Sequence, residues 1–211
     1  MKRGQVFVVE DDSALRSTLA ELLSSAGYQV LTWPEAKSFL AEMPKVAPAV
    51  LLTDMRMPEI SGLELHTALQ MQGKQIPVIY ISGESNLQEG IDAMKLGAID
   101  FLIKPFSRES LLAAIEKGLN LDVMQRSTAK QEEHLQAVIT RLAPREREVY
   151  RLMLKGYGNK EIMEALDISL ATTKQYKSEV LRKLDVRSLS QLMKLSEGTG
   201  QDLSGTQSSI R

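Results

Sequence analysis

The stretch LLTDMRMPEISG, residues 51–62, decides how the first half of this 211-residue chain folds. An apolar run from Ala49 to Thr53 predicts a buried strand, and Asp54 follows directly after it. Pro58 then interrupts the pattern, and leucines at helical spacing predict a helix over 62–71. A strand that ends on a carboxylate and leads through a short loop into a helix is the repeating unit of an alternating α/β fold.

The same unit recurs on both sides of this stretch. Further strands are predicted over 6–9, 29–32, 77–81 and 100–103, and further helices over 13–26, 34–43, 87–96 and 107–120. Because the strands are apolar along their length instead of alternating, both faces of their sheet are expected to be covered. The sequence therefore predicts an α/β domain over 1–120, a five-stranded doubly wound parallel sheet.

The remaining residues have a different pattern. Residues 121–140 are polar and contain neither glycine nor proline, which predicts a helical linker. Four helical segments follow, at 145–155, 160–166, 171–184 and 188–197. We expect them to form an all-α domain over 141–198, and the residues 199–211, rich in Gly, Ser, Thr and Gln, to form a flexible tail.

Composition excludes several classes of protein. The chain has no cysteine, so disulfides, thiolate metal sites and a cysteine nucleophile are excluded. Its apolar runs are far shorter than the ~20 residues of a membrane helix, and the N-terminus does not have the pattern of a signal peptide. The sequence therefore predicts a cytoplasmic protein without a membrane partner.

The formal net charge of -1 conceals a division between the two halves. Residues 1–120 carry 11 basic and 15 acidic side chains, whereas residues 141–196 carry 12 basic and 7 acidic ones. Such asymmetry is compatible with ordinary surface variation, and it also fits an acidic site in the first half and an anionic partner for the second.

Chemically distinctive side chains stand at the carboxyl ends of four predicted strands, the edge where open parallel α/β sheets bind ligands. They are Glu10 and Asp11, Asp54, Ser82 and Lys104. Each residue type alone is common in turns and helix caps, and Asp12 is expected to cap the first helix. Together, however, oxygen-only ligands favour Mg²⁺, and a carboxylate beside a metal, an ammonium and a hydroxyl can accept a phosphoryl group.

Four motifs carry a resemblance to a known family. They are VVEDD (8–12), LLTDMRMPEISG (51–62), YISGES (80–85) and DFLIKPF (100–106). With them, residues 4–120 resemble the receiver domain of two-component response regulators, which has a flavodoxin-like fold. The resemblance implies that Asp54 is the phosphoacceptor and that Glu10, Asp11, Asp54 and the backbone carbonyl of Arg56 hold Mg²⁺. The acidic pair here is Glu-Asp instead of Asp-Asp, which lengthens one ligand arm.

The same resemblance implies how the signal would spread. Lys104 would pair with the phosphoryl oxygens next to a cis bond to Pro105. Phosphorylation adds negative charge, which would draw Ser82 and Lys104 towards it and let Phe101 rotate inward. Hydrolases of the haloacid dehalogenase type use similar parts, but they need a second Asp where this chain has Arg56. A long-lived phosphoryl mark with at most slow self-dephosphorylation is therefore expected, and not an enzyme.

Residues 140–196 resemble the helix-turn-helix output domain of the LuxR/NarL/FixJ group. The matching residues include Pro144-Arg145-Glu146, Gly156, 159–162, Ile168-Ser169, Thr172, Lys174, Arg182-Lys183-Leu184 and Val186. The helix over 171–184 would enter the major groove of DNA with its polar face. That face carries Thr172, Thr173, Lys174, Gln175, Lys177 and Ser178. Lys174 is the first candidate for a DNA contact, and Arg182 and Lys183 are candidates for phosphate anchoring. The alternative to DNA binding is that this charged helix face is only exposed to solvent.

The two resemblances together identify the chain as similar to the FixJ/NarL class of transcription regulators. They imply a sensor histidine kinase, promoter DNA and RNA polymerase as partners, and a homodimer when the chain is phosphorylated. The alternative is a DNA-binding regulator that works without phosphorylation and uses its receiver for protein contacts. The two histidines, His66 and His134, are expected at the surface without a metal or phosphorelay role.

Overall fold

The computed structural model describes residues 3–83 and 87–197, so the predicted tail lies outside the described residues. The chain divides into two compact units, Met1–Gln125 and Arg126–Arg211. Within the described part of the chain, no helix combines the length and the apolar character needed to cross a lipid bilayer.

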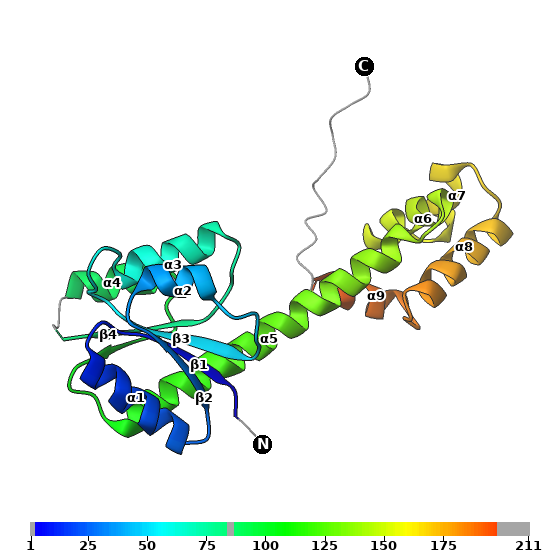
Figure 1. The fold of residues 1–211 in the computed structure, drawn as a ribbon. Coiled ribbons are helices and arrows are strands. Elements are labelled where there is room, and N and C mark those ends of the chain that lie inside the picture. Colours follow the sequence, from blue (N-terminus) through cyan, green and yellow to red (C-terminus); the bar gives the residue numbers. More distant parts are fainter. Residues whose placement is uncertain (1–2, 84–86, 198–211) are drawn as a thin grey trace. The chain divides into compact units, whose positions relative to one another are not determined.

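The first unit is a five-stranded parallel sheet in the order β2-β1-β3-β4-β5, with helices on both faces (Figure 1). Its elements are β1 (Gln5–Val9), α1 (Ser13–Ser25), β2 (Gln29–Trp33), α2 (Ala36–Glu42), β3 (Ala49–Asp54), α3 (Gly62–Met71), β4 (Val78–Ser82), α4 (Leu87–Lys95), β5 (Asp100–Ile103) and α5 (Arg108–Thr140). The predicted doubly wound sheet is confirmed. Helix α2 begins later than predicted, because the backbone of Glu35 is extended and this residue forms the N-cap.

Alternate strand residues face two separate cores. Phe7 and Tyr80 pack on the side covered by α2, α3 and α4, whereas Val8 and Ile79 pack on the side covered by α1 and α5. Strands buried on both faces need apolar side chains at consecutive positions, which explains the unbroken apolar runs in the sequence.

Strand β3, which ends on Asp54, is held at both ends. At its start, the buried carboxylate of Asp122 on α5 accepts a hydrogen bond from the backbone N–H of Ala49, at 2.9 Å. Beyond its end, the backbone N–H of Gly62 donates to the carbonyl of Met55, at 3.0 Å. A Cβ atom at position 62 would collide with the backbone carbonyl of Asp54, so a glycine is needed there for this loop to close.

His66 on α3 is buried, and its predicted surface position was wrong. Its side chain is 5% exposed, and Nδ1 lies 2.9 Å from the hydroxyl of Tyr80 on β4. Nε2 lies 3.4 Å from the amide nitrogen of Gln70, which donates to the carbonyl of Leu96 at 2.8 Å. The imidazole can be buried inside the unit because the Tyr80 hydroxyl of β4 is a hydrogen-bond partner for its Nδ1. His134 is exposed, as predicted.

Helix α5 does not end near Asn120, where the sequence predicted a separate linker to begin. It continues to Thr140, because residues 121–140 contain no helix breaker. Leu111 and Ile115 pack into the core beside α1, whereas Leu135 belongs to the core of the second unit. The residues predicted as a helical linker are therefore the continuation of α5.

The second unit contains the four predicted helices. They are α6 (Pro144–Leu154), α7 (Asn159–Leu166), α8 (Leu170–Lys183) and α9 (Leu189–Glu197). Its core includes Ile162, Val180 and Leu184, together with Val149 and Met153 of α6. Helix α7 ends on Asp167 in the left-handed conformation, and Ser169 caps α8 after a short turn.

Candidate functional site

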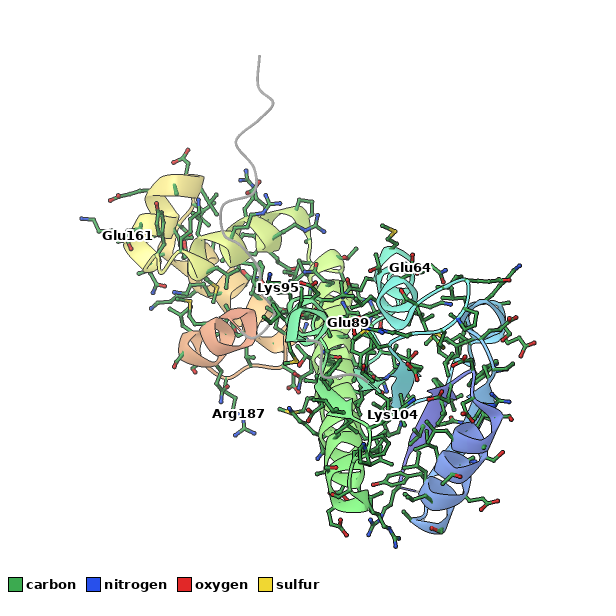
Figure 2. All side chains as sticks on the ribbon, turned by 90° about the vertical axis from the view of Figure 1, so that its left-hand side faces the viewer. Glu64, Glu89, Lys95, Lys104, Glu161 and Arg187 are labelled. Atoms are coloured by element: carbon green, nitrogen blue, oxygen red, sulfur yellow. The ribbon has the colours of Figure 1, made fainter. Side chains whose placement is uncertain are left out.

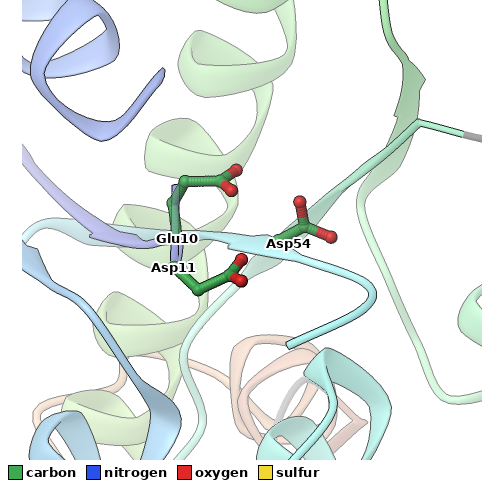
Figure 3. Close-up of side chains that lie close together, drawn as sticks. All are labelled: Glu10, Asp11 and Asp54. Carbon is green, nitrogen blue, oxygen red and sulfur yellow. The ribbon is translucent and has the colours of Figure 1, made fainter. Parts of the chain in front are cut away.

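The three predicted acidic ligands meet where the strand order reverses. Strand β1 pairs with β2 on one side and with β3 on the other, and the edge at such a reversal is where open parallel α/β sheets bind ligands. Figure 3 shows the carboxylates of Glu10, Asp11 and Asp54 directed into the same space. One oxygen from each residue lies within 4.8 Å of the others.

Lys104 joins this cluster from the end of β5. Its Nζ lies 3.1 Å from Glu10 Oε2 and 2.5 Å from Asp54 Oδ2. Glu10 and Asp54 are both buried, whereas Asp11 is exposed. The peptide bond between Lys104 and Pro105 is cis, as predicted. The structure thus brings together four residues that the sequence placed at the ends of three strands.

The electrostatics of the cluster indicate a shortage of positive charge. Burial and the negative charge of Asp54 raise the pKa of Glu10 to about 7. Burial of the Lys104 ammonium lowers its pKa, but hydrogen bonds to Asp54 and Glu10 outweigh burial and raise the pKa above its usual value. Three carboxylates against one ammonium, with oxygen as the only donor atom, fit a hard divalent cation. The cluster can therefore hold a metal ion.

The loop after β1 supports this arrangement. Asp12 caps α1 by accepting hydrogen bonds from the backbone N–H groups of Ala14 and Leu15, at 2.8 and 3.0 Å, which confirms its predicted role. Arg16 donates from Nη1 to the backbone carbonyls of Glu10 and Asp11, at 2.6 and 3.2 Å. Arg16 was not predicted from the sequence, although a basic residue one turn into the following helix was a usable signal.

Arg56 contacts Asp54 and α4 at once. Its backbone N–H donates to Asp54 Oδ1 at 2.7 Å, while its guanidinium donates to Glu89 Oε1 from Nε at 3.1 Å and from Nη2 at 2.8 Å. That the backbone carbonyl of Arg56 binds a metal ion stays a prediction. The side-chain pair was missed because 33 residues separate its partners.

Ser82 and Phe101, the predicted switch residues, lie on the neighbouring strands. Ser82 ends β4 and is 1% exposed, and its carbonyl accepts from the Lys104 backbone N–H at 2.7 Å. Phe101 is half-buried on β5 beside Tyr80 and packs against the core under α4, where Gly90 faces its ring. Phe101 thus lies between the sheet and α4, and its predicted rotation remains a prediction.

Helix α8 exposes a polar face in the second unit. Lys174, Gln175 and Ser178 are exposed, and Thr172 is half-buried beside the capping residue Ser169. Thr173 was predicted on this face, but it is fully buried and its hydroxyl donates to the Ser169 carbonyl at 3.0 Å. The exposed groups at the start of α8 are suited to contact with a polar, anionic partner.

The other basic candidates on α8 have protein partners. Lys177 donates to Asn159 at 2.9 Å, and Arg182 pairs with Glu179 at 2.7 Å. Lys183 donates to both carboxylate oxygens of Glu146, at 2.8 and 2.6 Å. Because Glu146 is buried, this pair fastens α8 to α6, and phosphate anchoring by Lys183 stays a prediction.

Comparison with known proteins assigns both units. Residues 6–116 match the model of the response regulator receiver domain, and residues 140–196 match the model of bacterial regulatory proteins of the luxR family. The chain belongs to the response regulator family. The response regulator protein TmoT of Ectopseudomonas mendocina is 38% identical to this response regulator over 192 residues, which cover 91% of this chain and 87% of TmoT.

Two solved structures resemble this response regulator over most of its length. The response regulator StyR is 39% identical with a TM-score of 0.77, and the match covers 92% of this chain and 98% of StyR. Full-length FixJ from B. japonicum is 34% identical with a TM-score of 0.59, and the match covers 95% and 98%. A receiver joined to a LuxR-type DNA-binding domain makes this response regulator a transcription regulator of a two-component system.

Proposed function

We propose that Asp54 is the phosphoacceptor of this response regulator and that a sensor histidine kinase supplies the phosphoryl group. The observation that carries the proposal is the environment of the Asp54 carboxylate. One oxygen accepts from the Lys104 ammonium and the other from the Arg56 backbone N–H, so the carboxylate is oriented by two donors at the end of β3. Such an arrangement positions a carboxylate oxygen for attack on phosphorus.

Glu10, Asp11, Asp54 and the carbonyl of Arg56 are the proposed ligands of Mg²⁺. The buried Glu10 carboxylate and the oxygen-only donor set support this choice. When bound, the ion supplies positive charge that compensates the phosphoryl oxygens.

The residues of the chain then carry the signal. As an Asp54 oxygen bonds to phosphorus, the bond between phosphorus and the donor breaks, and the negative charge at this position rises from one to about two. The Lys104 ammonium exchanges part of its contact with the carboxylates for a phosphoryl oxygen. The Ser82 hydroxyl moves towards the same group, and Phe101 rotates into the space that Ser82 leaves. This alters the surface formed by α4 and β5, which is a two-state element biased by a local charge.

The second unit reads promoter DNA in this proposal. Lys174, Gln175 and Ser178 are the proposed base-edge or phosphate contacts because they are exposed near the start of α8. Thr172, Lys177, Arg182 and Lys183 would contribute to the same interface. A single short helix-turn-helix has limited affinity, so a phosphorylated homodimer that binds two half-sites would raise it, and RNA polymerase is a further proposed partner.

Footprinting on promoter fragments, with and without a small-molecule phosphodonor, tests the proposal. We expect the phosphodonor to strengthen a specific footprint of the wild type and to leave Asp54→Asn unchanged. Glu59→Gln, an exposed carboxyl in the same loop, is the matched control and should respond like the wild type. A specific footprint that ignores both phosphodonor and Asp54→Asn would favour the phosphorylation-independent regulator, and the absence of any specific footprint would favour a receiver that signals through protein contacts.

A further inference from the structure

An ion pair between Arg56 and Glu89 connects the loop behind Asp54 to helix α4. Arg56 follows the phosphoacceptor by two positions, and its backbone already touches Asp54 Oδ1 at 2.7 Å. Its guanidinium donates twice to Glu89 Oε1, in the first turn of α4. Figure 2 labels Glu89 together with Lys104, the residue that contacts Asp54 from β5. A change at Asp54 can therefore reach α4 through one side chain.

We propose that the Arg56 guanidinium is a phosphoryl-binding group that α4 holds until Asp54 is modified. The inference rests on the proposed function of Asp54. On phosphorylation, Arg56 would leave Glu89 and pair with a phosphoryl oxygen. The exchange is favourable because a phosphoryl group carries about two negative charges and three acceptor oxygens, whereas Glu89 carries one charge.

The burial of the two partners supports an exchange. The Arg56 side chain is 51% exposed, so the guanidinium can move without disturbing a core. The Glu89 side chain is only 22% exposed, and its second oxygen, Oε2, is buried without a hydrogen-bond partner among the described residues. Loss of Arg56 would leave this half-buried carboxylate uncompensated, which is unfavourable. Departure of Arg56 therefore destabilises the first turn of α4 and couples the phosphoryl group to that helix.

The test measures the affinity of the full chain for beryllofluoride, an analogue of the phosphoryl group, at saturating Mg²⁺ by titration calorimetry. Arg56→Met removes the guanidinium but keeps the backbone groups, and it should weaken binding by about threefold or more. Glu89→Gln removes the ion pair with Arg56 in advance and should tighten binding by about threefold. Asp92→Asn removes a charge from the same helix without contacting Arg56 and is the matched control, with unchanged affinity expected.

The double variant Arg56→Met, Glu89→Gln distinguishes an exchange of Arg56 from a general effect of the Glu89 charge on the affinity for beryllofluoride. If Arg56 is exchanged, Glu89→Gln has no effect in the Arg56→Met background, because no cation remains to be released. Tightening of equal size in both backgrounds, or shifts of the two single variants in the same direction, would overturn the inference. A wild type that binds no beryllofluoride would instead overturn the proposed role of Asp54.

Hydrogen exchange gives a second readout on α4. Beryllofluoride should accelerate amide exchange at residues 91–93 of the wild type, whose N–H groups donate to the carbonyls of the first turn of α4, because Glu89 loses its partner. The same amides should not respond in Arg56→Met. A wild-type α4 that exchanges equally with and without beryllofluoride would contradict the coupling.

Discussion

Replacement of Gly62 by alanine should destabilise the receiver, although alanine is normally the better helix residue. Gly62 is the first residue of α3, where alanine would gain about 1 kcal/mol in helix propensity. Against this gain, the new Cβ would collide with the carbonyl oxygen of Asp54 and lie 3.2 Å from its carbonyl carbon. Backbone atoms of a central strand cannot give way locally, and overpacking of this kind costs about 3 kcal/mol. The net loss is then about 2 kcal/mol.

Urea unfolding measures this loss in the receiver alone. Trp33 is the single tryptophan of the chain and is buried in the first unit, so its fluorescence follows that unit. With a urea m-value of about 2 kcal/mol/M, Gly62→Ala should lower the midpoint by about 1 M. The displaced loop carries Arg56, so the proposed phosphorylation of Asp54 should slow as well.

Gly90→Ala is the matched control for this prediction. Its Cβ would meet Phe101 at an ordinary contact distance of 3.9 Å inside α4, and the gain in helix propensity should raise stability by about 0.5–1 kcal/mol. A Gly62→Ala midpoint equal to or above that of the wild type would refute the reasoning about the Asp54 carbonyl.

Three further predictions concern the second unit. The hydrogen bond from Lys183 lowers the pKa of Glu146 below its ordinary value of 4.5, so this pair stabilises the unit above that pH and the contribution disappears as the pH falls through the lowered pKa. Glu146→Gln should therefore flatten the acid unfolding curve followed by circular dichroism, and an unchanged curve would exclude the pair. Leu135→Ala should cost the second unit about 2–4 kcal/mol and leave the Trp33 transition unchanged, since Leu135 is buried in that unit alone. Lys174→Ala should weaken promoter binding and lower the slope of affinity against salt by about 1, whereas an unchanged slope would place Lys174 outside the interface.

The residues at the ends of the strands were predictable because two simple rules act on them. Apolar runs reveal the strands of a covered parallel sheet, and the carboxyl ends of such strands share one edge. The positions of Glu10, Asp54 and Lys104 followed from these rules without knowledge of any contact. The resemblance to receivers added the expected role of each of these residues, and it also predicted the cis peptide bond between Lys104 and Pro105.

Pairs between distant elements were not predictable in the same way. The burial of His66 depends on the Tyr80 hydroxyl, which comes from a strand that the periodicity of α3 does not reveal. The exposed polar face assigned to α8 included Thr173, because helical spacing alone cannot distinguish a threonine that bonds its own N-cap carbonyl from one that faces solvent. The pair between Lys183 and Glu146 of α6 could not be predicted from the sequence either, since 37 residues separate the two.

The polar path from Tyr80 through His66 and Gln70 to Leu96 limits which parts of the receiver can shift. Apolar contacts tolerate sliding of a helix over a sheet, but hydrogen bonds lose their energy when direction and distance change. Helix α3 is thus fixed to strand β4 through Tyr80 and to the residue that follows α4, Leu96. The near end of α4 is held by the ion pair between Glu89 and Arg56, so once that pair opens the helix would swing about Leu96 instead of translating. The last turn of α4 would stay in place while its first turn moves.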